Sequence, residues 1–275
     1  MKLSDMDIRK PAVAGKFYPS DAANLKKQIK GFIDISAVKQ DVIGCMLPHA
    51  GYIYSGKVAA QTVSNVNIKD RIILLGPNHT GYGAELSIVT KGFWQTPLGQ
   101  IKIDEELAEQ VLKQNPYLQE DNLAHLYEHS LEVELPILQY FRSDFKITPI
   151  VILSDEIKKL KKTGESIAQC IINMNIKGSV MIIASSDMTH YESKEDAERK
   201  DKIAIQSILE LNEDQLMENI KKFNITMCGR APVIVMITAA KILGAKTAKL
   251  IKYQTSADVS GDTYSVVGYA GMIVY

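Results

Sequence analysis

Three of the five histidines in this chain of 275 residues, His49, His79 and His190, lie a few residues after apolar runs that are typical of buried strands. If these runs form parallel strands, their carboxyl ends meet at one edge of the sheet, which is where ligands bind in open α/β folds. Imidazole is a good ligand for iron, copper and zinc. The spacing therefore predicts that the three side chains converge on one pocket, although a single loop histidine is more often an ordinary hydrogen-bonding residue.

The sequence around Cys228, Met-Cys-Gly-Arg-Ala-Pro, leads into an apolar stretch that is typical of a helix. A thiol near a helix N-terminus feels positive partial charge, which favours the metal-binding thiolate, and Arg230 acts in the same direction. We therefore expect Cys228 to be a fourth element of the site. The alternative, a small buried apolar residue, is our interpretation of Cys45, in a predicted strand, and Cys170, in a predicted helix.

Three further residues are candidates for proton transfer. Asp187 precedes His190 by three residues, and an aspartate so placed can orient an imidazole or share a substrate proton. His129 lies just before a predicted helix and can point into the same cleft. The alternatives are that Asp187 caps the following turn and that His129 is bonded locally. We take His190, Asp187 and His129 as candidate catalytic residues and expect His125 on the surface.

Strands and helices that alternate along the chain are needed to position these residues. The predicted strands are 42–47, 71–75, 85–90, 147–153, 179–184, 248–253 and 266–275. The predicted helices are 21–33, 55–66, 104–113, 130–141, 157–173, 194–211, 213–223 and 232–243. Runs rich in Ile and Val without polar alternation suit strands that are buried on both faces. The order predicts a single α/β domain over residues 1–275, with a largely parallel central sheet flanked by helices.

Composition excludes some classes of function. The chain has 32 Lys and Arg against 32 Asp and Glu, so its formal net charge is zero. Nucleic acids and anionic membranes attract proteins with a basic surplus, and we expect neither as a partner. The chain has no apolar run long enough to suggest a membrane span. Three cysteines without a CxxC pair, and a polar N-terminal stretch, indicate a reduced cytoplasmic protein.

The segments around the candidate site residues, with one further segment near each end of the chain, resemble the successive signature motifs of the Memo family in order and spacing. The matching segments are Pro11-Ala12-Val13-Ala14-Gly15-Lys16-Phe17-Tyr18-Pro19, Pro48-His49-Ala50-Gly51-Tyr52, Gly76-Pro77-Asn78-His79, Glu128-His129-Ser130-Leu131-Glu132, Ser185-Ser186-Asp187-Met188-Thr189-His190, Cys228-Gly229-Arg230-Ala231-Pro232 and Ser265-Val266-Val267-Gly268-Tyr269-Ala270. Each motif alone is modest, but the set is specific and covers nearly the whole chain.

The resemblance implies a fold similar to the catalytic subunit of the class III extradiol dioxygenases, which hold Fe(II) with two histidines and one carboxylate. It places His49 and His79 as the metal histidines, His190 as the acid/base residue, and Cys228 where the dioxygenases have their carboxylate. A thiolate softens the site and favours iron, copper or zinc. Catechol cleavage is therefore not carried over, and Fe(II) is the expected cofactor, with copper or zinc as alternatives.

Three functions stay open at this point. The first is an oxidoreductase that uses Fe(II) or copper on an unknown substrate. The second is a zinc-dependent hydrolase, because two histidines and a cysteine with one open position form a known catalytic zinc set. The third is a module that binds a small molecule or peptide in the cleft without chemistry. The sequence does not indicate the oligomeric state.

Overall fold

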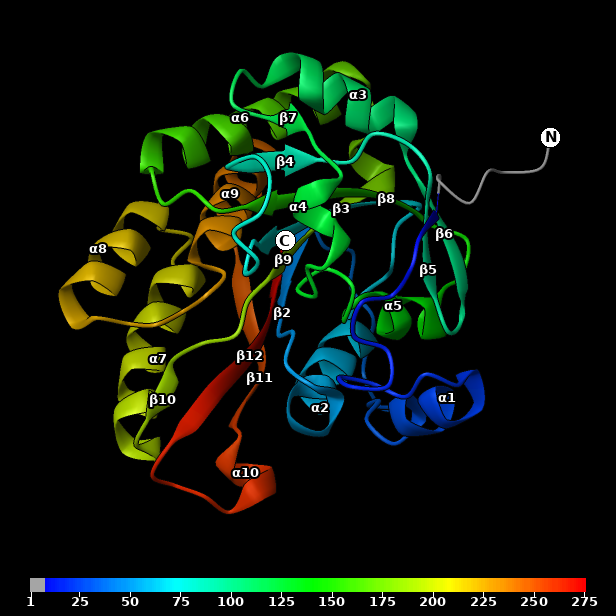
Figure 1. The fold of residues 1–275 in the computed structure, drawn as a ribbon. Coiled ribbons are helices and arrows are strands. Elements are labelled where there is room, and N and C mark those ends of the chain that lie inside the picture. The colour runs from blue at the N-terminus through cyan, green and yellow to red at the C-terminus, as the bar shows by residue number, and fades with distance from the viewer. Residues whose placement is uncertain (1–7) are drawn as a thin grey trace.

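The computed structural model describes residues 8–275, and these residues are built on one mixed sheet (Figure 1). Its main path runs β1-β5-β6-β8-β3-β9-β2-β12-β10. The centre consists of four parallel neighbours: β8 (Lys146–Ile152), β3 (Arg71–Pro77), β9 (Val180–Ser185) and β2 (Gly44–Leu47). The α/β fold with a largely parallel central sheet that the sequence predicts is confirmed.

Shorter or antiparallel strands extend this centre on both sides. On one side are β12 (Val266–Val274), which pairs antiparallel with β2, and its own antiparallel partners β11 (Ala248–Thr255) and β10 (His190–Glu192). On the other side are β1 (Ile8–Arg9), β4 (Leu86–Ile88), β5 (Phe93–Thr96), β6 (Gly99–Ile103) and β7 (Gln119–Glu120). The β5–β6 hairpin is absent from the sequence prediction, because its residues alternate between buried and exposed instead of forming an apolar run.

Helices cover both faces of the sheet, as Figure 1 shows. One layer contains α3 (Glu105–Gln114), α6 (Ile157–Asn173) and α9 (Arg230–Ile242), with α9 packed directly on the central strands. The other contains α1 (Ala22–Lys30), α2 (Tyr52–Ser64) and α5 (Leu135–Phe141). The remaining helices are α4 (Leu123–Leu126), α7 (Lys194–Leu209), α8 (Glu213–Phe223), α10 (Ala257–Ser260) and a 3₁₀ turn at Lys177–Ser179.

The central strands are covered on both faces, and this explains their composition. Every residue of β2 and β9 is buried, as is all of β3 except Arg71. Strands in this position have no solvent face and therefore show no polar alternation. Their carboxyl ends emerge at one edge of the sheet, where the loops that carry the histidines begin. Within residues 8–275, no helix is both long enough and apolar enough to cross a membrane.

One boundary differs from the prediction in a way that affects the site. The helix expected over 130–141 begins only at Leu135. The residues before it form turns that wrap two buried carboxylates. Glu128 accepts the backbone N–H groups of His129 and Ser130, and Glu132 accepts those of Ala12 and Val13. These bonds hold the loop in place instead of a helical turn.

Candidate metal centre

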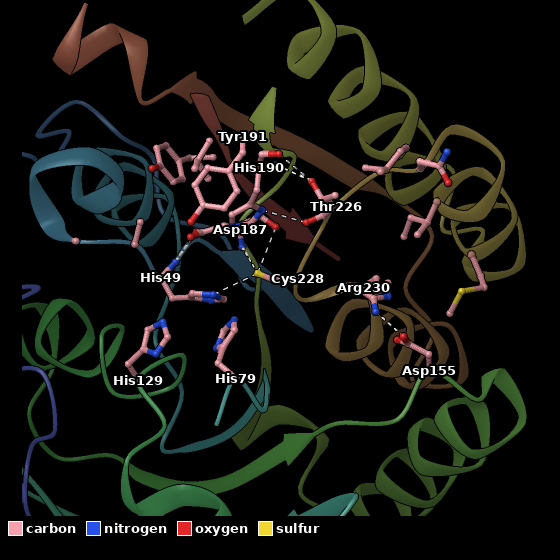
Figure 2. A pocket seen from close by; sticks show the side chains of 18 of the residues that line it. His49, His79, His129, Asp155, Asp187, His190, Tyr191, Thr226, Cys228 and Arg230 are labelled. Atoms are coloured by element: carbon pink, nitrogen blue, oxygen red, sulfur yellow. Dashed lines mark hydrogen bonds and ion pairs between the residues drawn. The ribbon is translucent and has the colours of Figure 1, made fainter. Parts of the chain in front are cut away.

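The three histidines that follow predicted strands lie at the same edge of the sheet. His49 lies two residues beyond β2, and His79 lies two residues beyond β3. His190 begins β10, five residues after the end of β9. Since β3, β9 and β2 are parallel neighbours, their loops emerge side by side. All three histidines line one pocket (Figure 2).

The tightest cluster consists of His49, His79 and His129. One nitrogen from each ring lies within 4.8 Å of the others, so the group could hold a metal ion. The ring centroids of His49 are 5.1 Å from His79 and 5.6 Å from His129, and those of His79 and His129 are 4.7 Å apart and stacked. His190 lines the same pocket but is not part of this group. The structure thus adds His129 as a candidate ligand beside its predicted catalytic role.

The imidazole of His49 is held by a serine behind it. Ser185 Oγ donates its hydrogen to the Ser130 carbonyl at 2.7 Å, so it can only accept from His49 Nδ1, also at 2.7 Å. This assigns the ring proton to Nδ1 and leaves the Nε2 lone pair facing the pocket. Burial, reinforced by the neighbouring imidazoles, holds the pKa of His49 well below its usual range. The ring is neutral, as a metal ligand must be.

The imidazole of His79 is held by Glu128. Its Nδ1 lies 2.9 Å from Glu128 Oε1, and its backbone N–H donates to Oε2 of the same carboxylate. Burial alone would raise the pKa of Glu128, but the hydrogen bond from His79 and the positive charge of nearby imidazoles lower it to about 2. A carboxylate behind a histidine is the usual outer support of a metal ligand. Sequence analysis missed this residue, although its place directly before His129 is a signal.

Cys228 lies next to His49, but it is not one of the three residues whose ligand atoms lie within 4.8 Å of one another. Its Sγ is 3.3 Å from His49 Nε2, and it accepts the backbone N–H of Asp187 at 3.3 Å. The expected thiolate is not supported, because burial and the nearby Asp187 raise the pKa of the Cys228 thiol. Burial outweighs the helix N-terminus. A metal cation would reverse this balance, because a coordinating thiol is deprotonated outright.

Asp187 and His190 have separate hydrogen-bond partners. Asp187 Oδ1 accepts the backbone N–H of His49 at 2.8 Å, and burial raises the pKa of this carboxyl to about 6. His190 is oriented by Thr226, whose carbonyl lies 3.0 Å from its Nδ1 and whose hydroxyl accepts its backbone N–H at 2.7 Å. Because a carbonyl only accepts, Nδ1 of His190 carries the proton. Sequence analysis missed Thr226, and the catalytic roles of Asp187 and His190 stay predictions.

The prediction that His125 lies on the surface is wrong. Its side chain is 1% exposed, and its Nε2 lies 3.1 Å from Ser87 Oγ. The ring packs edge-on against Trp94, while Arg9 donates to its carbonyl at 2.7 Å. Arg9 and Trp94 lie on β1 and β5, which sequence analysis had not found, whereas Ser87 lies on β4, within the predicted strand 85–90. His125 does not line the pocket around the other four histidines.

The pocket around the histidines has a volume of about 880 Å³. Beyond the candidate ligands, it is lined by Phe17 and Tyr269 near the histidines and by residues of α8 and the start of α9 further away. Tyr191 lines the pocket in a left-handed backbone conformation, with φ of 60°. Such a conformation is costly for a tyrosine and clusters at functional sites.

Known proteins resemble this chain along its whole length. The family described as "Memo-like protein" matches residues 9–273. The chain is 44% identical to a "MEMO1 family protein" of Aquifex aeolicus, covering 98% of this chain and 99% of that one. It is 44% identical to one of Methanosarcina mazei, covering 98% and 100%, and 42% identical to one of Methanococcoides burtonii, covering 97% and 100%. The resemblance found in the sequence is confirmed.

Proposed function

This chain belongs to the Memo-like protein family, and we propose that it is a metal-dependent oxidoreductase acting on a small molecule. The proposed metal is Fe(II) or copper, and the proposed ligands are His49, His79 and Cys228. The observation that supports it most is the cluster of imidazole nitrogens of His49, His79 and His129 within 4.8 Å of one another. His49 and His79 follow β2 and β3, the parallel strands on either side of β9. Two of the three rings are also held from behind, His49 by Ser185 and His79 by Glu128.

The residues present fit a metal in their proton arrangement. The Nδ1 atoms of His49 and His79 are occupied by Ser185 and Glu128, so both Nε2 atoms are free to bind. Cys228 Sγ lies 3.3 Å from His49 Nε2, beside the imidazole cluster. Two imidazoles and a soft sulfur suit iron, copper or zinc better than magnesium or calcium.

We assign Cys228 as the third ligand and His129 to proton transfer, although His129 lies in the same cluster. A thiolate contributes a negative charge next to the cation, which a third neutral imidazole does not. Glu128 and Glu132 place negative charge near His129, but burial dominates and lowers the pKa of its imidazole. A neutral His129 can accept a proton or serve as a ligand, and the experiment below separates these roles.

A bound redox metal would supply electron transfer and open coordination positions for substrate or O₂. The chain's own residues then handle the proton. His190 Nδ1 is occupied by the Thr226 carbonyl, so its Nε2 can accept a proton from substrate. The pocket walls formed by Phe17 and Tyr269 exclude part of the water around the site. A positioned acid or base of this kind typically contributes about 10²–10⁴-fold in rate.

One observation favours a second candidate, a zinc-dependent hydrolase. Three imidazoles around one point also form a catalytic zinc set, in which zinc lowers the pKa of bound water. This alternative uses His129 as a ligand and leaves Cys228 as a neighbour. Metal identity and ligand identity therefore distinguish the two candidates together.

The test is metal content per chain in protein purified without oxygen, chelators or affinity-tag metals. Wild type should carry iron or copper at close to one per chain. His49→Ala, His79→Ala and Cys228→Ala should lose it, while His129→Ala should keep it. Zinc at one per chain, lost in His129→Ala and kept in Cys228→Ala, would establish the hydrolase-type centre. Wild-type metal content in all four variants, or no metal in wild type after anaerobic loading, would overturn the proposal.

A further inference from the structure

The pocket extends well beyond the imidazole cluster. A volume of about 880 Å³ is in the range of sites that enclose a whole small molecule. Its far end is formed by α8, by the loop between α8 and α9, and by Asp155 in the loop after β8. In Figure 2, Arg230 and Asp155 lie across the pocket from His49, His79 and His129. The site therefore has two ends, and only one is accounted for by a metal.

The wall of the far end includes an apolar surface. Met217 and Ile220 of α8 and Ile225 of the following loop line the pocket, and each presents a small apolar face to it, with 4–6% of the residue exposed. Their packing against the core fixes the wall, so little side-chain entropy is lost when a ligand binds.

Positive charge borders this apolar wall. Arg230 and Lys221 line the far end, and Asp155 is the acid that lines it with them, so the three groups sum to one positive charge. Arg230 Nη1 donates to the Met227 carbonyl at 3.0 Å, and Nη2 pairs with Asp155. A guanidinium has five N–H donors, so others stay available for a ligand. Lys221 forms no ion pair with any residue in the described range 8–275.

We infer that the far end binds the carboxylate of an amphipathic organic acid, whose apolar body lies on Met217, Ile220 and Ile225 and whose other end reaches the imidazole cluster. The planar guanidinium of Arg230 matches a carboxylate with two parallel hydrogen bonds. Lys221 adds a second cation at the rim. The inference rests on the proposed function only in making the bound acid a substrate.

A simpler reading is that Arg230 and Asp155 form a bridge between α9 and the loop after β8, and that Lys221 complements the carboxyl end of α8. The two readings differ in what Asp155 does. As half of a bridge, Asp155 has no effect on ligand affinity once the protein is folded. As the acid that competes for the guanidinium, it weakens the binding of an anion. Replacing it with asparagine should then tighten binding.

The experiment compares octanoate with octanamide, which share length and apolar body but differ in charge. Calorimetry on the full chain measures both probes with wild type, Arg230→Gln, Lys221→Gln and Asp155→Asn. Lys222→Gln is the matched control, because Lys222 neighbours Lys221 but does not line the pocket. Octanoate should bind at least about tenfold more tightly than octanamide, with a loss of about tenfold or more in Arg230→Gln.

The variants are expected to change the affinity for octanoate in opposite directions. Asp155→Asn should bind octanoate several-fold more tightly than wild type, which no partly unfolded variant would do. Lys221→Gln should lose about two- to fivefold, as expected for an exposed charge, and Lys222→Gln should match wild type. Equal affinity for octanoate and octanamide, no binding of either at millimolar concentration, or wild-type affinity in both Arg230→Gln and Asp155→Asn would overturn the inference. Chelator-treated protein is measured in parallel. Octanoate selectivity there supports the carboxylate site whether or not the proposed metal centre is found.

Discussion

His49 and His125 are both buried histidines, yet only one has the surroundings of a metal ligand. Their side chains are 2% and 1% exposed, and burial lowers the pKa of both imidazoles. Each also has a serine hydroxyl on one ring nitrogen. The two histidines differ in the surroundings of the second ring nitrogen. That of His49 faces Cys228 and two further imidazoles, whereas Nδ1 of His125 has no hydrogen-bond partner among residues 8–275.

This comparison shows that burial and a neutral ring do not by themselves make a candidate metal ligand. The His125 ring packs edge-on against Trp94, and its carbonyl accepts a hydrogen bond from Arg9 of β1. Its surroundings are those of a packed core residue. His49 lies where the carboxyl ends of parallel strands bring other donors to the same point. Convergence, set by topology, is the feature that distinguishes them.

The largest expected effect is on metal affinity when His49 is removed. His49→Ala should weaken iron or copper binding by more than the roughly 10–100-fold that loss of an outer partner typically costs, because a ligand itself is lost. His125→Gln, which replaces a histidine that is equally buried, should bind the metal as tightly as wild type does. Competition with a chromophoric chelator measures both. Equal metal affinities of the two variants would mean that His49 is no more a metal ligand than His125 is.

A smaller loss is expected when the support behind His79 is weakened. Glu128→Gln loses the charge that holds the His79 ring and keeps only one of the two oxygens that accept backbone N–H groups. Metal affinity should fall by about 10–100-fold, with little change in ligand number. The same competition assay applies, with a thermal scan to confirm folding. An unchanged metal affinity would mean that Glu128 only holds the backbone of its loop in place.

His125 should contribute to stability in a way that depends on pH. Burial lowers its folded pKa to about 3, below the ordinary value of 6.5, so the unfolded chain binds an extra proton between these limits. The folding stability that depends on a neutral His125 is therefore fully present above about pH 6.5 and is lost as the pH falls toward 3. Between pH 7 and pH 4 the loss is about 3 kcal/mol. Urea unfolding at both pH values should show a smaller difference for His125→Gln than for wild type, and equal differences would contradict this.

The smallest effect on metal affinity is expected for His190. His190 lies outside the imidazole cluster and is oriented by Thr226, so His190→Gln should retain its metal. Any activity found should fall by about 10²–10⁴-fold, as for loss of an acid or base. Metal analysis and a turnover assay on the same preparation check both halves. Loss of metal with the fold intact would make His190 a ligand instead.

The sequence predicts the central architecture because its signals are local. The apolar runs of β2, β3 and β9 lack polar alternation, and only a sheet covered on both faces accommodates them. Once those strands are parallel, His49 and His79 must emerge at one edge. The order of the neighbouring strands, which places them side by side, depends on pairing that no local pattern encodes.

The residues that the sequence analysis missed act through contacts distant in the chain. Glu128 supports His79 across 49 positions, and Thr226 supports His190 across 36. His125 is buried by Arg9, 116 positions away, on a strand of two residues. The Cys228 thiol is a different case. The helix N-terminus beside it can be recognised in the sequence, whereas the burial and the nearby Asp187 that raise its pKa cannot.

X-ray absorption at the metal edge of the iron-loaded chain tests the proposed centre most directly. The account predicts imidazole nitrogens and one sulfur in the first coordination sphere. The sulfur should lie at about 2.3 Å and the nitrogens at about 2.0–2.1 Å, taking the zinc distances as a guide. In Cys228→Glu the sulfur should be replaced by oxygen while the imidazoles stay, and the sulfur-to-iron charge-transfer absorption of the oxidised protein should vanish. A sphere of oxygens alone, or a sulfur-free sphere in the wild type, would contradict a centre formed by His49, His79 and Cys228.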